Sequence, residues 1–248
     1  MGVIVSISME RYDEETPNYS NDTLFVFRQC AVTGTCKLNV PTVKQGKALC
    51  GPATIEMVFR YWGINKYNQY DIAYNILTFN PEAKRVQKSG ILETSRISWE
   101  RYPGTGTSTM REFLKQFSST KNNKYKKLSN DPVKAEKQKA KIWKLVQQYL
   151  NDGIPVIVHQ YLNDGIPVIV HQYWKGVNST GHYRVVTGYD NYRKQVFLND
   201  ANPGKKIKQS YEEFFKKWNV NEPWLHYNAI AFNIDKEKLS IKLDKYYN

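Results

Sequence analysis

The stretch QGKALCGPATIEMVFRYWG, residues 45–63, decides the fold prediction. Its first five residues are typical of a loop. Cys50-Gly51-Pro52 then predicts the first turn of a helix, where proline is tolerated because its missing N–H would be unpaired anyway. Apolar side chains follow with helical spacing, at Ile55, Val58, Phe59 and Trp62. Because Gly63 ends this pattern, Cys50 is expected at the N-terminus of an amphipathic helix that buries one face.

Outward from this helix, helical patterns come first and strand patterns later. Further helices are predicted over residues 69–77, 108–117, 134–150 and 211–218. Runs rich in β-branched and aromatic residues predict strands over residues 154–158, 166–170, 183–189, 195–199 and 228–234. This order favours an α+β fold over an alternating parallel sheet.

Residues 1–39 are predicted to be a β-rich N-terminal extension, and residues 40–248 the main domain. The extension holds two β-rich pieces, residues 3–8 and 23–32. A chain of 248 residues with 41% apolar and 24% charged residues can bury a sizeable core. No window holds the roughly 18 apolar residues that a membrane span needs, and no signal peptide is visible. The compartment is left open between the cytoplasm and secretion after processing.

Residues 149–160 and 161–172 carry the same twelve letters, YLNDGIPVIVHQ. Two identical copies do not make a repeat architecture and indicate a recent duplication or an insertion. One copy is expected to fill the original strand. The other bulges out or, as we favour, pairs with it in a hairpin across residues 163–165, a good turn sequence. The repeated His159 and His171 are expected to be strand residues without a catalytic role.

A formal charge of +13 limits the kinds of partner that fit. Much of the excess lies in residues 121–127 (KNNKYKK) and 134–141 (KAEKQKAK). Such runs are usually solvated loops or helix faces, and we expect a loop for the first and a helix for the second. The charge would also guide acidic peptides or polymers towards the protein. Nucleic acid is not expected, because aromatic residues do not alternate with these lysines.

The three cysteines leave one without a partner if two of them pair. Cys30 and Cys36 are six residues apart and can close a small disulfide loop, which would leave Cys50 as a free thiol. Three reduced thiols, as in a cytosolic protein, are the alternative. The spacing of the cysteines and the lack of nearby histidines disfavour a zinc site.

Cys50 and His182 are the candidate nucleophile and general base. A thiol reacts as the thiolate, and the positive end of a helix dipole together with an imidazolium partner lowers its pKa. His182 lies at the start of the predicted strand YRVVT, so it would project from a rigid element, as a general base must.

Asp200 and Gln45 complete the candidate site. Asp200 ends the next predicted strand, and antiparallel pairing would bring it back to His182, whose ring it could orient. Asp190 is the rival, but it falls at the turn between the two strands. Gln45 lies five residues before Cys50 and could place its amide beside the Cys50 N–H as an oxyanion donor.

In several segments, the chain resembles the C39-like peptidases of the papain-like superfamily. VPTVKQGKALCGPATIEMVFRYWG (residues 40–63) is similar to that family's opening motif, and GTGTSTMREFL (residues 104–114) to the start of its second helix. GIPVIV, GHYRVVTGYDN and VFLNDANPG resemble the strands that bear its histidine and aspartate. The resemblance covers about residues 40–204, and the N-terminal extension has no counterpart in it.

This resemblance implies a papain-like fold, in which a helical half with the cysteine at a helix N-terminus packs on an antiparallel sheet. It implies Cys50 as nucleophile, His182 as base, Asp200 as orienting residue and Gln45 as oxyanion donor. The expected activity is peptide-bond cleavage through a thioester, with a peptide or protein substrate and no metal or organic cofactor. A catalytically silent peptide- or polymer-binding domain on the same scaffold is the alternative, and a basic nucleic-acid-binding protein is a third hypothesis. Oligomeric state cannot be read from the sequence.

Overall fold

The computed structural model describes residues 30, 32–93, 95–161, 181–220 and 225–246. Their strands form one antiparallel sheet in the order β2-β7-β3-β4-β5-β6, with β1 paired to the far end of β4. The strands are β1 Thr35–Lys37, β2 Thr120–Tyr125, β3 Val156–Tyr161, β4 Gly181–Asp190, β5 Gln195–Asp200, β6 Lys205–Ser210 and β7 His226–Phe232.

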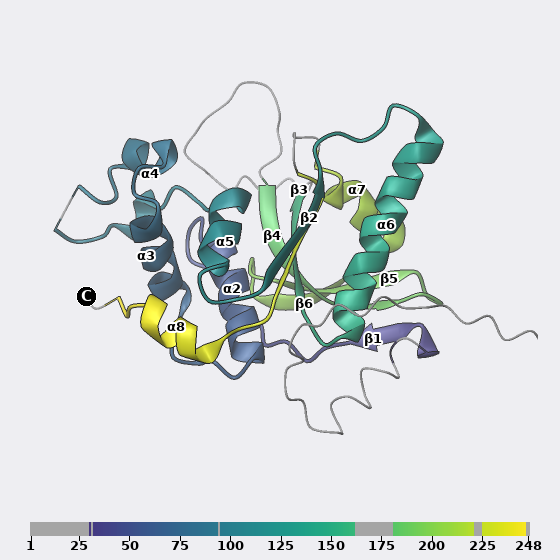
Figure 1. Cartoon of the computed structure of the whole chain (residues 1–248), viewed down its shortest axis with the longest axis horizontal. Coiled ribbons are helices and arrows are strands. Elements are labelled where there is room, and N and C mark those ends of the chain that lie inside the picture. Colours follow the sequence, from purple (N-terminus) through teal and green to yellow (C-terminus); the bar gives the residue numbers. More distant parts are fainter. Residues whose placement is uncertain (1–29, 31, 94, 162–180, 221–224, 247–248) are drawn as a thin grey trace, which may run out of the picture.

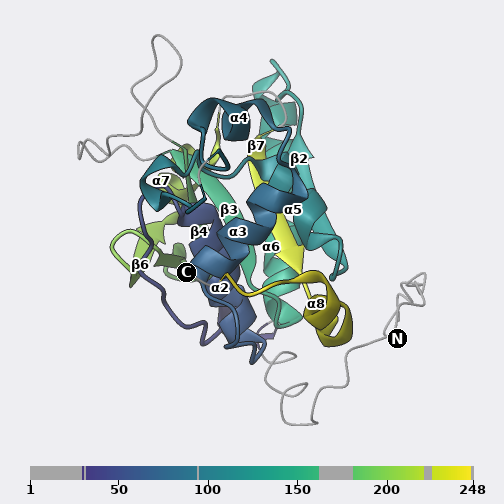
Figure 2. The same cartoon turned by 90° about the vertical axis from the view of Figure 1, so that its left-hand side faces the viewer.

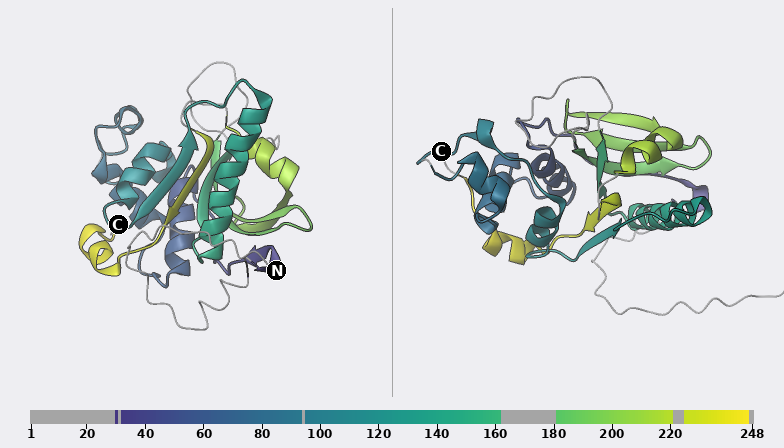
Figure 3. Two further views of the ribbon diagram at one scale, coloured as in Figure 1. Left: turned by 45° about the vertical axis from the view of Figure 1, so that its right-hand side comes forward. Right: turned by 90° about the horizontal axis from the view of Figure 1, so that it is seen from above.

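Helices cover both faces of this sheet. They are α2 Cys50–Tyr61, α3 Gln69–Phe79, α4 Lys84–Ser89, α5 Thr107–Leu114, α6 Pro132–Asn151, α7 Tyr211–Trp218 and α8 Lys236–Lys242, with a 3-10 turn at Trp99–Arg101. Helices α2, α3, α4, α5 and α8 gather on one side, whereas α6 and α7 lie on the other (Figures 1 and 3). Figure 2 looks onto the first group, in which α3 and α5 lie in front of the sheet. The predicted α+β architecture is confirmed.

Helix α2 is more deeply buried than the sequence pattern predicts. Every residue from Gly51 to Phe59 is buried, including Glu56, because α2 is packed between α3 and β4. The apolar stripe in the sequence predicts burial of one helix face only. The polar residues of the other face are buried as well, and they are hydrogen-bonded: Thr54 donates to the Gly51 carbonyl, and Glu56 accepts from the N–H of Gln69. The helix ends at Tyr61, and Gly63 takes a positive φ of 79° after it.

Several elements of the structure differ from the sequence predictions or have no counterpart among them. The prediction of a lysine-rich loop over residues 121–127 is wrong up to Tyr125, because these residues belong to β2, which pairs with β7. Strand β6 and helices α4 and α8 were not predicted, since the sequences KKIKQS and KRVQKS lack a clear apolar period. The β-rich piece at residues 23–32 is wrong at Cys30 and Val32, which are helical. The piece at residues 3–8 lies outside the described residues.

The first of the two identical copies supplies β3. Residues Val156–Val158 pair with β4 on one edge and with β7 on the other. Both edges of this stretch are therefore occupied, and the expected hairpin between the copies is wrong along these three residues. The strand predicted at residues 166–170 lies outside the described residues. Strand β4 pairs with both β3 and β5, and His182 contacts Asp200, so the second copy does not keep His182 away from its predicted partner.

Deleting residues 161–172 is expected to leave the fold intact. Because the copies are identical, the shortened chain has the same sequence whichever copy is removed, and the remaining copy can form β3. The β3–β4 connection becomes twelve residues shorter, which by loop-closure entropy should raise the free energy of unfolding by roughly 1 kcal/mol or less. Urea unfolding of the two chains measures this difference. A clear loss of stability would mean that the extra residues contribute to the native structure.

Two further features bear on the sequence predictions. Cys30 and Cys36 form a disulfide, so Cys50 is the free thiol among the three cysteines. Within the described ranges, no helix has both the length and the apolar character needed to cross a membrane.

Candidate active site

Cys50 is the first residue of α2, at the end where the backbone N–H groups have no partner within the helix. Leu49 before it provides no side-chain cap, so the positive end of the helix dipole acts on the thiol. The N–H groups of Gly51 and Tyr183 bond to the sulfur. A Cβ on Gly51 would come within 2.9 Å of the Thr105 and Met110 side chains. The glycine therefore lets the segment before α5 close against the start of the helix.

His182, the second residue of β4, contacts both Cys50 and Asp200. Its Nε2 lies 2.7 Å from Oδ1 of Asp200, which leaves Nδ1 for the hydrogen bond with the Cys50 sulfur. Asp200 ends β5, and the antiparallel register sets it opposite Arg184, two residues beyond His182. Both side chains are buried. The structure thus brings the three predicted residues into one hydrogen-bonded series.

The electrostatics favour a thiolate–imidazolium pair. Burial opposes ionisation of Cys50, but the hydrogen bond and charge of His182, together with the N–H groups of Tyr183 and Gly51, outweigh it and lower the pKa of the thiol. Burial also disfavours the charged form of His182, yet Asp200 and Cys50 together raise its pKa from 6.5 to about 9. The pKa of Asp200 is lowered despite burial, by His182 and Arg184. Proton transfer from the thiol to the imidazole is therefore favoured before any substrate arrives.

The rival carboxylate, Asp190, lies at the opposite end of β4. Its Oδ1 accepts hydrogen bonds from the backbone N–H groups of Tyr192 and Arg193, at 3.0 and 2.9 Å. Its Oδ2 pairs with the Arg193 guanidinium at 3.1 Å. Asp190 thus stabilises the β4–β5 turn and does not contact His182.

Gln45 lies in the loop before α2, as the sequence predicts. Its backbone N–H donates to the Ala201 carbonyl at 2.9 Å, which ties the loop to the residue after Asp200. Its side-chain Nε2 makes a long 3.3 Å bond to the Gly46 carbonyl, and its buried Oε1 has no partner among the described residues. The side-chain amide of Gln45 therefore lies against the loop before α2 and has unused hydrogen-bonding capacity.

A family model described as the Peptidase_C39 like family matches residues 37–224. The chain belongs to this family. The resemblance drawn from the sequence is thereby confirmed, and the chain is a peptidase at the level of the family. Xylellain, a cysteine protease from Xylella fastidiosa, is similar in its crystal structure, with a TM-score of 0.44 and 11% identity over 92% of this chain and 99% of that one. No curated protein matches.

In this member of the C39-like family, a buried polar network lies behind Asp200 that the sequence did not predict. Arg184 donates from Nε to Oδ2 of Asp200 at 2.7 Å and from Nη1 to Oε1 of Gln160 at 2.8 Å. Gln160 in turn donates to Gln209 on β6 at 3.2 Å. Arg184 is 3% exposed and Gln160 is fully buried. The sequence signal for this network is the arginine within the apolar strand YRVVT, because a buried charge needs a partner.

His159 of the first copy lies beside the site without joining its hydrogen bonds. Its ring packs on Tyr183, with centroids 4.8 Å apart, and a Cβ on Gly181 would lie only 2.2 Å from its Nε2. Burial lowers the pKa of His159 to about 4, so the ring is neutral next to the His182 imidazolium. The strand position expected for His159 is confirmed. His171 lies outside the described residues.

Proposed function

We propose that this protein is a cysteine peptidase in which Cys50, His182 and Asp200 form the catalytic triad. The observation that carries the proposal is the hydrogen-bonded series that joins the partly exposed Cys50 at a helix N-terminus to the buried His182 and Asp200, with the pKa lowered at Cys50 and raised at His182. Such coupled, opposite shifts are typical of an activated nucleophile and its base.

The reaction follows from the protonation states. The Cys50 thiolate attacks a peptide carbonyl, and Gln45 and the Cys50 N–H stabilise the oxyanion. The imidazolium of His182 gives its proton to the leaving amine as the C–N bond breaks and the thioester remains. Water then attacks the thioester while His182 takes its proton, which releases the acid and restores the thiolate. Asp200 holds the ring in place and stabilises its charge throughout.

The substrate is a peptide or protein, and the net charge of +13 favours acidic segments. A preference for acidic segments stays a prediction from composition. A binding domain that keeps the scaffold but does not react is the second candidate. The lowered pKa of Cys50 and the raised pKa of His182 support the reactive site over this second candidate.

Treatment with p-nitrophenyl acetate tests the proposal without a known substrate. Attack on this ester is expected to place one acetyl group on Cys50, at least about 100-fold faster than on the same thiol in the unfolded chain, because base and oxyanion donors act only in the folded site. Intact-mass spectrometry follows both the gain of the acetyl group and its loss by hydrolysis. Cys30 and Cys36 are paired, so Cys50 is the thiol that can take the label, and Cys50→Ala is the control that measures the slower background acetylation of amines. Acetylation no faster than that of the unfolded chain would favour the binding domain.

A further inference from the structure

Gln69, the first residue of α3, holds the loop that carries Gln45. Its Oε1 accepts the backbone N–H of Gly46 at 2.7 Å, and its Nε2 donates to the backbone carbonyl of Lys44 at 2.9 Å. One side-chain amide therefore binds the residues immediately before and after Gln45. Gln69 is 8% exposed, so water competes little for these two bonds.

The loop depends on this contact because the Gln45 side chain is poorly fixed by itself. Among the described residues, its side chain makes one hydrogen bond, the 3.3 Å contact to the adjacent Gly46 carbonyl. Beyond that, the direction of the amide is set by the backbone of the loop. Gln69 holds this backbone at Lys44 and Gly46, and the Ala201 carbonyl holds it at the N–H of Gln45. Loss of either support would let the Gln45 amide change its direction.

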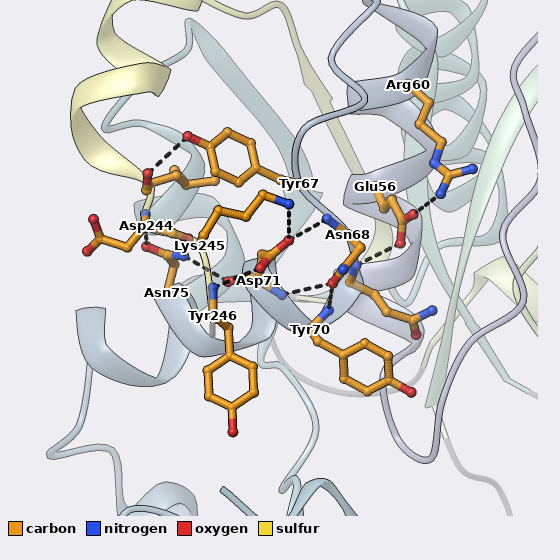
Figure 4. Close-up of polar contacts among 12 residues, drawn as sticks. Glu56, Arg60, Tyr67, Asn68, Tyr70, Asp71, Asn75, Asp244, Lys245 and Tyr246 are labelled. Carbon is orange, nitrogen blue, oxygen red and sulfur yellow. Dashed lines mark hydrogen bonds and ion pairs between the residues drawn. The ribbon is translucent and has the colours of Figure 1, made fainter. Parts of the chain in front are cut away.

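The position of Gln69 is set in turn by the helix that carries the nucleophile. The backbone N–H of Gln69 donates to Oε2 of Glu56 at 2.7 Å, and Glu56 lies on α2, six residues after Cys50. Glu56 is 1% exposed and its other oxygen pairs with Arg60 (Figure 4). The start of α3 is closed by a capping box, in which Asn68 and Asp71 exchange hydrogen bonds. Cys50 and the Gln45 loop are thus linked through Glu56 and Gln69.

We propose that Gln69 is a positioning residue that keeps Gln45 aligned as the oxyanion donor, an inference that rests on the proposed function. Gln69 does not touch the substrate. Its effect is confined to steps that develop negative charge on a carbonyl oxygen. Ester and peptide cleavage have such a step, whereas alkylation of a thiolate by iodoacetamide is a displacement at a saturated carbon and has none.

Gln69→Ala is therefore expected to separate the two reactions of Cys50. Acetylation by p-nitrophenyl acetate should fall by at least about tenfold, towards the roughly 100-fold that loss of an oxyanion donor costs. Alkylation by iodoacetamide should keep its rate and its pH profile. In the double variant with Gln45→Ala, the loss should be no larger than in Gln45→Ala alone, because Gln69 acts through Gln45.

Asn75→Ala is the matched control on the same helix. Asn75 is also a buried amide that clamps a distant backbone, since it bonds to both the N–H and the carbonyl of Asp244 (Figure 4). Its removal should destabilise the C-terminal segment but leave both reactions of Cys50 unchanged. If Gln69→Ala does not fold, Gln69→Glu keeps the size and the acceptor for Gly46 while losing the donor to Lys44, and the same split is expected.

Three outcomes would overturn the inference. Acetylation of the Gln69 variants at the wild-type rate, a parallel loss of acetylation and alkylation, or additive losses in the double variant each exclude a role through Gln45. In all three, the wild-type chain still forms its acetyl thioester, so the proposed function stands. If the wild-type chain is not acetylated, both proposals fail.

Discussion

Replacing His182 by alanine should raise the pKa of the Cys50 thiol to its ordinary value of about 8.5 or higher and remove its reactivity at neutral pH. His182 supplies both the side-chain hydrogen bond and the positive charge that stabilise the thiolate. Once they are lost, burial of the sulfur remains as the largest effect and favours the neutral thiol. The helix N-terminus and the N–H groups of Gly51 and Tyr183 offset only part of that burial.

The measurement is the rate of Cys50 alkylation by iodoacetamide as a function of pH. In the wild-type chain, the rate should rise to its plateau well below the pH of about 8.5 at which an ordinary thiol ionises. In His182→Ala, the rise should move to that pH or above it. His159→Ala is the matched control, because this neighbouring ring makes no hydrogen bond to the sulfur. A wild-type profile that already resembles an ordinary thiol would contradict both the ion pair and the proposed mechanism.

Peptide cleavage, in which the leaving amine needs a proton, should have an alkaline limb that alkylation lacks. His182 must be protonated to act as the acid, and its pKa is raised from 6.5 to about 9, so turnover should fall as the pH rises through about 9. The same raised pKa contributes to stability. That contribution is complete below the ordinary pKa of 6.5 and is lost as the pH rises to about 9.

The positions of Cys50, His182 and Asp200 could be predicted because each depends on local sequence. A proline two residues after Cys50 and an apolar period behind it are enough to predict a helix start. His182 and Asp200 stand at the ends of consecutive strands with a short turn between them, and antiparallel pairing of such neighbours is the common outcome. The structure bears out each of these positions, while their catalytic roles stay a proposal.

The supporting residues could not be predicted because they act between elements far apart in the chain. Gln69 reaches back to Lys44 and Gly46, and Gln160 meets Arg184 across β3 and β4. Nothing in their local sequence distinguishes them from other glutamines. The hairpin between the two copies is wrong along Val156–Val158 for a related reason, since turn propensity at residues 163–165 carries no information about β7, which pairs with those three residues.

Asp200→Asn should affect activity and stability together. The amide keeps the shape of the side chain but loses the charge that Asp200 presents to two groups, His182 and Arg184. Ester cleavage should fall by about 10³ to 10⁴, the size of the effect when the acidic member of a triad is neutralised. The free energy of unfolding should fall by about 3–5 kcal/mol, because the buried Arg184 is left without a counter-charge.

Asp190→Asn is the matched control for activity. It neutralises a carboxylate on the same pair of strands that pairs with the exposed Arg193, and the amide oxygen can still accept the turn's N–H bonds. Ester cleavage should stay at the wild-type rate. An equal loss of ester cleavage in Asp200→Asn and Asp190→Asn would mean that the hydrogen bond between Asp200 and His182 does not support the reaction.

The double variant Asp200→Asn with Arg184→Gln separates the two effects. Removing the arginine charge takes away the cause of the instability, since the two amides can bond to each other and to Gln160. The free energy of unfolding should recover most of its loss, as urea denaturation would measure. Ester cleavage should stay low, because no carboxylate then accepts a hydrogen bond from Nε2 of His182 and stabilises its imidazolium. Recovery of cleavage together with stability would show instead that Asp200 serves the fold and not the reaction.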